Sequence, residues 1–203
     1  MTVRSSVARR ERAREHARRE ILEAAAEVFA RRGYTAATLA DLAEAAGFAA
    51  PSLYRYFGSK EEIFQSLVEM LGAEVKATFE CPVDRTLPFG ERLAALFSGQ
   101  QRLAESRGEI FDLVLGNAAQ GAPCTLEGRS LADPGAGIAY YEEQLTGWLR
   151  RNASQGELRR GPEVAARAIA GIVFAYHHRR GEHPDPAERT RLVIDLALHG
   201  VSP

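Results

Sequence analysis

The segment Gly47–Lys60 constrains the fold of this chain more than any other, because three consecutive side chains in it cannot share one core. It reads Gly-Phe-Ala-Ala-Pro-Ser-Leu-Tyr-Arg-Tyr-Phe-Gly-Ser-Lys. A turn glycine precedes a predicted short helix, in which consecutive positions point about 100° apart. Tyr54, Arg55 and Tyr56 therefore cannot all face inward. At least one tyrosine and the arginine must meet something outside the domain.

Two predicted helices before this segment end at glycines. Apolar residues recur at helical spacing over residues 18–32, and Gly33 follows in the manner of a C-cap. Thr38 opens a second helix, with Asp41 three residues later as its capping-box partner, and Gly47 closes it. Both helices are therefore expected to be short and well delimited.

Two more predicted helices follow directly. Pro51 suits the first turn of a third helix, where its missing N–H costs nothing, and this helix is expected to end near Gly58. Ser59 and Glu62 have the spacing of a second capping box, so a long helix is expected to start at Ser59. The second and third helices, joined by a short turn containing Gly47, have the organisation of a helix-turn-helix motif.

The rest of the chain is also predicted to be helical, and no alternating strand pattern of useful length is present. We expect an all-α fold of about nine helices. Later helices are expected at 89–106, 108–120, 163–177 and 187–199, together with an amphipathic helix that contains 138–149. A loop is expected over Gly121–Gly137 and a polar turn over Asn152–Gly161. The expected organisation is a basic arm (1–17), a helix-turn-helix DNA-binding domain (18–60) and a ligand-binding and dimerisation domain (61–203).

Charge is unevenly distributed along the chain, although the net charge is only −1. Residues 1–60 contain 11 Lys/Arg and 7 Asp/Glu, about +4, whereas residues 61–203 contain 15 and 20, about −5. Seven arginines fall within residues 1–19. A basic first third favours an anionic partner at the N-terminal end.

The residue types around the motif suit contacts with double-stranded DNA. In a helix-turn-helix the second helix of the motif enters the major groove, while the first lies against the backbone. A hydroxyl and free N–H groups at a helix N-terminus, as at Thr38, can bind a phosphate. Tyrosine hydroxyls can donate to phosphates, and Arg55 can reach a phosphate or a guanine edge. The candidate DNA contacts are Thr38, Ala50, Pro51, Ser52, Tyr54, Arg55, Tyr56 and Lys60.

Residues 18–65 resemble the TetR family of bacterial transcriptional regulators. The resemblance lies in Gly33-Tyr-Thr-x-x-Thr-Leu-x-x-Leu-Ala-x-x-Ala-Gly47 and in Leu53-Tyr-x-Tyr-Phe-x-x-Lys-Glu61. It implies a homodimeric repressor that binds a palindromic operator and is released by a small-molecule effector in its C-terminal domain. Ala50 departs from the family, because many members have a polar residue there. Base recognition is therefore expected from Ser52, Arg55 and the arm.

The C-terminal domain offers candidates for effector binding and for dimerisation. Aromatic residues at helical spacing belong to a core more often than to a ligand site, so both interpretations stay open for them. A helix with small residues permits close helix approach, and we expect it to form a four-helix dimer interface with the last helix. The candidate effector contacts are Phe111, Asn117, Gln120, Tyr141 and Trp148, and the small residues are Ala165, Ala168, Gly171 and Ala175.

Metal, cofactor and membrane functions are not expected. Cys81 and Cys124 form neither a disulfide framework nor a metal site and are expected to be reduced thiols in a cytoplasmic protein. His177, His178 and His183 lack a matched cluster of cysteines or carboxylates. No apolar run approaches the roughly 18 residues of a membrane span. The arginine-rich N-terminus is followed by no apolar region of the kind found in a secretory signal.

Two other classes of function fit the sequence less well than a DNA-binding regulator does. An enzyme on an all-α scaffold would need convergent catalytic groups, and the sequence shows no Ser/His/Asp order, no glycine-rich phosphate loop and no metal-ligand spacing. A helical adaptor could use the aromatic face around Tyr54 for protein contacts. We expect a regulator that is not an enzyme.

Overall fold

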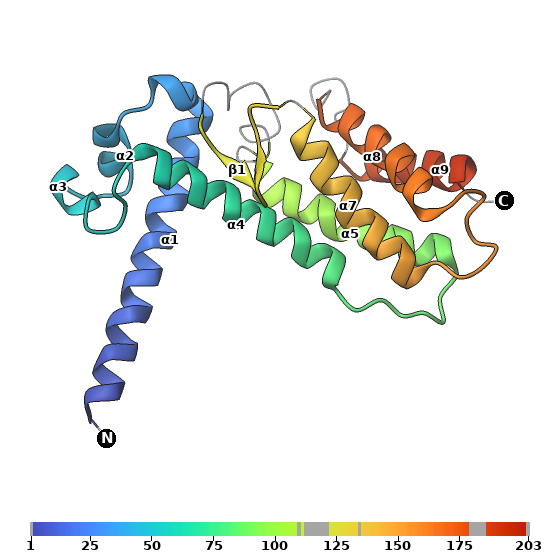
Figure 1. Cartoon of the computed structure of the whole chain (residues 1–203), viewed down its shortest axis with the longest axis horizontal. Coiled ribbons are helices and arrows are strands. Elements are labelled where there is room, and N and C mark those ends of the chain that lie inside the picture. Colours follow the sequence, from blue (N-terminus) through green and yellow to red (C-terminus); the bar gives the residue numbers. More distant parts are fainter. Residues whose placement is uncertain (1, 109–110, 112–121, 134, 179–185, 202–203) are drawn as a thin grey trace. The chain divides into compact units, whose positions relative to one another are not determined.

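The computed structural model describes residues 2–108, 111, 122–133, 135–178 and 186–201, and most of these residues are helical (Figure 1). This confirms the predicted all-α fold. The described helices are α1 (Thr2–Ala36), α2 (Leu39–Ala45), α3 (Ala50–Leu53), α4 (Lys60–Glu80), α5 (Phe89–Ser106), α7 (Ala136–Asn152), α8 (Pro162–His178) and α9 (Pro186–Val201). No helix in the described part of the chain is both long and apolar enough to cross a membrane.

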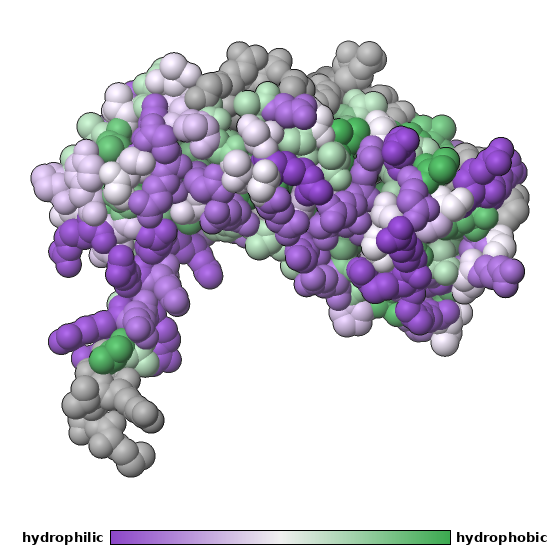
Figure 2. Space-filling view, viewed as in Figure 1, coloured by the Kyte–Doolittle hydropathy of each residue, from purple (hydrophilic) through white to green (hydrophobic). Residues whose placement is uncertain are grey.

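Helix α1 is much longer than predicted. It begins at Thr2 and includes residues 2–17 of the basic arm that we expected before the first helix (1–17). Hydrophilic residues cover most of residues 7–17 (Figure 2). At the other end, Gly33 interrupts the helix with φ 74° and ψ 163°, as expected of a C-cap glycine, and a last turn continues to Ala36.

The second helix forms as predicted, and the third is shorter. Thr38 and Asp41 form the full capping box at the start of α2. Helix α3 spans only Ala50–Leu53, although we expected it to continue to Gly58. After Leu53 the chain tightens into turns in which the Tyr56 N–H donates to the Leu53 carbonyl at 2.9 Å. Bonds of this i to i+3 type commonly tighten a helix end.

The predicted capping box before α4 forms with one changed partner. The Ser59 Oγ accepts the Glu62 N–H at 3.2 Å, as expected. The Glu62 carboxylate reaches back one residue further than predicted and accepts the Gly58 N–H at 2.7 Å. Both interactions satisfy N–H groups at the start of the helix, so the sequence signal located the helix start correctly.

The chain divides into two compact units, and the division falls within α4, after Leu71. The core of the first unit is formed by fully buried side chains from α1 to α4. Phe29 packs edge-on against Phe64 with ring centroids 5.2 Å apart, and Tyr34 contacts both rings. The other large buried members are Ile21, Leu42, Leu53, Phe57, Ile63 and Leu67.

The first unit also contains a β-hairpin that the sequence did not predict. Strand β1 (Thr125–Leu126) pairs antiparallel with β2 (Arg129–Ser130), inside the stretch expected to be a loop. Its two-residue turn has positive φ at Glu127 (45°) and Gly128 (80°). Such a turn matches the twist of a tight hairpin. Strands of two residues carry too little periodicity to be recognised in a sequence.

The second unit is a helical bundle of α5, α7, α8, α9 and the latter part of α4. The predicted bounds of its helices agree with the structure to within a few residues. For α5 both predicted ends, residues 89 and 106, are those of the structure. Trp148, Leu145 and Leu93 are fully buried in its core. Arg92 is buried as well, and its guanidinium donates to the Asn152 carbonyl and the Glu157 carboxylate.

Candidate nucleic-acid interface

The residues after α3 divide between the core and the surface, as the spacing of the sequence requires. Leu53 and Phe57 are buried and anchor the segment. Tyr54 has 57% of its surface exposed, and Arg55 is also exposed. Tyr56 is half-buried, because its ring packs edge-on against Phe48 at 5.6 Å. The structure therefore presents a tyrosine and an arginine side by side outside the core.

The start of α3 presents smaller groups. Pro51 is exposed, while Ala50 and Ser52 are half-buried. Ala50 is the first residue of the helix and has only a methyl group to offer. The Ser52 hydroxyl can both donate and accept hydrogen bonds, so it is the better candidate for contact with a base edge.

The Thr38 side chain is hydrogen-bonded within the N-cap of α2. Its Oγ1 donates to Asp41 Oδ2 at 2.7 Å and accepts the Asp41 N–H at 3.2 Å. These hydrogen bonds from the Thr38 hydroxyl and backbone N–H, together with the Arg32 guanidinium at 2.7 Å, lower the pKa of Asp41. Because the hydroxyl proton points to Asp41, a phosphate at this position would have to accept from other N–H groups of the helix start.

Lys60 makes internal contacts that the sequence did not indicate. Its Nζ donates to the carbonyls of Tyr34 (2.9 Å) and Ala37 (3.0 Å) and lies 4.4 Å from the centroid of the Tyr34 ring. It thus joins the start of α4 to the connection between α1 and α2. An ammonium group has three N–H donors, so one remains for the phosphate contact that we predicted.

Tyr34 and Glu61 form a second link between the same elements. The Tyr34 hydroxyl donates to Glu61 Oε1 at 3.0 Å. Burial, aided by this hydrogen bond and by the charge of Glu61, raises the pKa of Tyr34 to about 12. The pKa of Glu61 is lowered by its own backbone N–H, by the Ser59 side chain and by Tyr34. Tyr34 therefore stays neutral and Glu61 charged at neutral pH.

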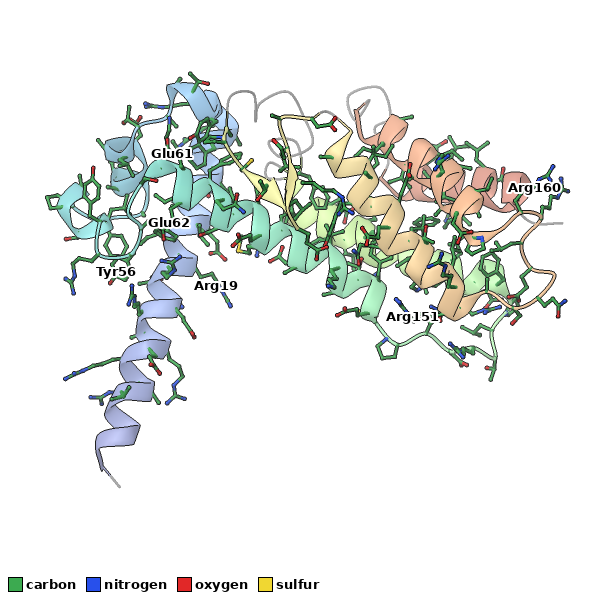
Figure 3. The ribbon with its side chains drawn as sticks, in the orientation of Figure 1. Arg19, Tyr56, Glu61, Glu62, Arg151 and Arg160 are labelled. Carbon is green, nitrogen blue, oxygen red and sulfur yellow. The ribbon has the colours of Figure 1, made fainter. Side chains whose placement is uncertain are left out.

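Arg18 is a positioning residue that sequence reasoning missed. Its guanidinium lies over the Phe57 ring, 4.0 Å from the centroid, and donates to the Tyr56 carbonyl. Glu62 Oε1 lies 3.7 Å from the same group. Arg19, the residue after Arg18, points elsewhere: in Figure 3 it lies on a different side of α1 from Tyr56. The sequence did contain a signal for this inward position, because Arg18 is three residues before Ile21, which is buried, and the two therefore lie on the same face of α1.

The hairpin is attached to α4 by one side chain. Gln65 Nε2 donates to the Thr125 carbonyl at 2.9 Å, and Gln65 Oε1 accepts the Thr125 N–H at 2.8 Å. The side-chain amide thus reproduces the pairing of a neighbouring strand. Next to it, Cys124 is buried, and burial raises the pKa of its thiol.

The candidate effector contacts are only partly visible. Asn117 and Gln120 lie outside the described residues, as does His183, and Phe111 is half-buried. Tyr141 and Trp148 are buried together in the core of the second unit. The Tyr141 hydroxyl donates to Gln100 Oε1 at 2.6 Å.

The indole nitrogen of Trp148 is the notable polar atom of this core. Trp148 Nε1 is buried and has no hydrogen-bond partner among the described residues. An unpaired buried donor costs about 1–3 kcal/mol. Arg92 Nε is a second buried donor without a partner there, but it belongs to a guanidinium that already donates to Asn152 and Glu157, so the Trp148 N–H is the donor that an apolar ligand's acceptor would satisfy.

The small residues of α8 do not all lie on one face. Ala165 is buried within its own subunit, so our inclusion of it in a dimer interface was wrong. Ala168, Gly171 and Ala175 are exposed, and Val164 on the same face has 57% of its surface exposed. A Cβ placed on Gly171 would meet no atom within 4 Å.

Comparisons with known proteins match the N-terminal part of the chain most specifically. Residues 21–67 match the model of the family described as bacterial regulatory proteins, tetR family. The transcriptional repressor KstR2 of Mycobacterium tuberculosis is 42% identical over 80 residues, which make up 39% of this chain and 40% of that repressor. The matched stretch thus spans less than half of the relative's length.

Solved structures extend the likeness to most of the chain. PfmR, a TetR-family regulator from Thermus thermophilus, is 29% identical, with 88% of this chain and 97% of that chain covered and a TM-score of 0.66. FadR from Bacillus subtilis, solved in complex with stearoyl-CoA, shares the fold at 23% identity and a TM-score of 0.65, with 89% and 97% covered.

Proposed function

We propose that the chain is a member of the TetR family of bacterial regulatory proteins and that it represses transcription by binding a palindromic operator as a homodimer that a small molecule releases. The observation that carries DNA binding is the exposed pair Tyr54–Arg55, placed after α3 by buried Leu53 and Phe57. In this proposal Tyr54, Tyr56 and Lys60 contact phosphates, and Ser52 and Arg55 contact base edges.

A binding experiment tests this surface directly. An operator is selected from a randomised duplex library, and its affinity is measured by fluorescence anisotropy at several salt concentrations. We expect Arg55→Gln to weaken binding roughly tenfold or more. Tyr54→Phe removes a hydrogen bond to phosphate but no charge, so it should weaken binding and leave the slope of log affinity against log salt unchanged. Arg102→Gln, which removes an exposed charge on α5, is the control and should change neither affinity nor slope. Affinity independent of salt would overturn the proposal.

Dimerisation is supported by the exposed face of α8. Val164, Ala168, Gly171 and Ala175 follow the spacing of one helix face, and Leu196 on the adjacent α9 is 41% exposed. Close packing of two such helix pairs would form a four-helix interface. A dimer would present two copies of α3, and their separation would have to match about one turn of DNA, 34–36 Å.

Sedimentation at micromolar concentration tests the dimer. Gly171→Arg should leave the fold of the subunit intact, because the position is open, but should block close helix approach and yield monomers. Ala95→Arg, at an exposed position of α5, is the matched control and should remain dimeric. A monomeric unsubstituted protein would contradict both the dimer and the palindromic operator.

Effector binding is supported by the buried, unpaired Trp148 N–H and by the neighbouring Tyr141–Gln100 pair. These groups suit an apolar ligand that carries a hydrogen-bond acceptor. Trp148 is the single tryptophan of the chain, so its fluorescence reports directly on this core. Stearoyl-CoA, the ligand solved with FadR, is a suitable first probe. A fluorescence change together with release of the operator supports the site, whereas release without such a change argues against it.

The proposed route of release runs through α4. Lys60 and Glu61 join its first turn to the connection before α2, and Gln65 joins its second turn to the hairpin. The hairpin directly precedes α7, which carries Tyr141 and Trp148. In this proposal a shift of α7 on effector binding is passed along the chain to the hairpin and, through Gln65, to the first part of α4. The effector must bind the DNA-incompetent state more tightly, because equal affinity for both states shifts nothing.

A further inference from the structure

The N-terminal part of α1 extends well beyond the core of its unit (Figure 1). Residues 7–16 are exposed at every position, and the first buried residue after them is Ile21. At 1.5 Å of rise per residue, residues 7–16 are about 15 Å long. We call residues 7–16 the arm helix. The core of the unit closes without this extension.

The arm helix has no partner within the described chain. Its hydrogen bonds and ion pairs there are local: Arg12 Nε donates to the Ala8 carbonyl, and His16 lies 3.4 Å from Glu20. Its surface is polar on all sides, apart from Val7 and two alanines. A helix without an apolar stripe can dock neither on a core nor in a coiled-coil seam.

The charges of the arm helix favour an anionic partner. It contains four arginines and two glutamates, and Arg4 precedes it. Basic residues near a helix N-terminus are unfavourable by themselves, and a helix of this length is marginal in water. A polyanion would offset both costs. Insertion into a lipid surface would require an apolar face, which this helix lacks. The arginines of the arm helix are Arg9, Arg10, Arg12 and Arg14.

The arm helix leaves the domain beside the candidate DNA contacts. Arg18, two residues after it, lies over Phe57 and donates to the Tyr56 carbonyl. The base of the arm helix is therefore fixed against the turn that carries Tyr54 and Arg55. From this point the arm helix, about 15 Å long, could follow about four base pairs, at 3.4 Å each.

We propose that the arm helix binds the phosphate backbone of DNA flanking the half-site contacted by α3. This inference rests on the proposed function, since it needs the operator as its partner. The arm helix would add affinity and lengthen the footprint without adding base recognition, because phosphate contacts are independent of sequence.

A quadruple variant, Arg9→Gln, Arg10→Gln, Arg12→Gln and Arg14→Gln, tests the proposal in the full-length protein. Glutamine has nearly the helix propensity of arginine, so the helix is preserved. We expect the salt slope to fall by about 0.9 for each lost phosphate contact, or about two to four per subunit. The hydroxyl-radical footprint should shorten by roughly four base pairs on both outer flanks. A duplex trimmed to the core operator should bind both proteins equally.

The matched control removes the opposite charge from the same helix. Glu11→Gln with Glu15→Gln should strengthen binding to the long duplex or leave it unchanged. Equal slopes and footprints for the quadruple variant and the unsubstituted protein would overturn the inference, as would arm-dependent binding to phosphatidylglycerol vesicles with no effect on DNA. Failure of the proposed function is distinguishable, because the unsubstituted protein would then bind DNA without salt dependence.

Discussion

The side-chain amide of Gln65 pairs with the backbone of Thr125 through both of its polar atoms, at 2.9 and 2.8 Å. One residue of α4 thus substitutes for a neighbouring strand and fixes the hairpin. The two residues are 60 positions apart in the sequence. The pairing makes α4 part of two connections, one to the hairpin and one to the α1–α2 region.

Replacing Gln65 by methionine should remove this attachment. The variant keeps the size of the side chain but loses both hydrogen bonds to Thr125, so we expect the free energy of unfolding to fall by about 1–2 kcal/mol. Gln101→Met is the matched control, because Gln101 makes the same i,i+4 bond to a glutamate within its own helix. Urea denaturation measures both. Equal losses in the two variants would mean that the hairpin contact contributes nothing.

Replacing Lys60 by methionine should destabilise the first unit. Two carbonyls, those of Tyr34 and Ala37, would lose a charged donor, and we expect a loss of about 1–3 kcal/mol in the free energy of unfolding. Lys76→Met, at an exposed position of the same helix, provides the comparison. If Lys60→Met weakened DNA binding at unchanged stability, the side chain would act on phosphate alone.

Replacing Asp41 by asparagine should destabilise α2 in a pH-dependent way. The pKa of Asp41 is lowered in the folded state, so its carboxylate contributes stability above its ordinary pKa of 3.8, and the contribution is lost as pH falls through the folded pKa. The difference in thermal midpoint between the two proteins should be full at pH 7 and shrink below about pH 4. Glu44→Gln, exposed on the same helix, should show no such trend.

Replacing Arg18 by glutamine should loosen the turn after α3. Loss of the contact with the Phe57 ring and of the bond to the Tyr56 carbonyl should cost about 1–2 kcal/mol, since 30% of the Arg18 side chain is exposed. Arg19→Gln changes the same charge at the next position, where the side chain is exposed. Thermal unfolding should separate the two, and equal midpoints would refute a positioning role for Arg18.

Features that depend on neighbouring residues could be predicted from the sequence. The Thr38–Asp41 box, the glycine at Gly33, the bounds of α5 and the exposure of Tyr54 all follow from bonds or periodicities that span a few residues. Such signals exist before the chain packs, because a helix cap is complete within its own first turn. The helix-turn-helix and the exposure of Arg55 with at least one neighbouring tyrosine were therefore evident without a structure.

Features that depend on distant residues appeared only in the tertiary structure. Lys60 was expected at a phosphate, yet it caps carbonyls 23 and 26 residues away, and Arg18 fixes a turn 38 residues away. Ala165 could not be distinguished from Ala168 by composition, and only packing buried one and exposed the other. A donor binds whichever acceptor the fold brings within reach, and spacing along the chain does not encode that distance. The sequence by itself thus determined the DNA-binding motif, and the packing of α1 and the hairpin against α4 decided how that motif is positioned.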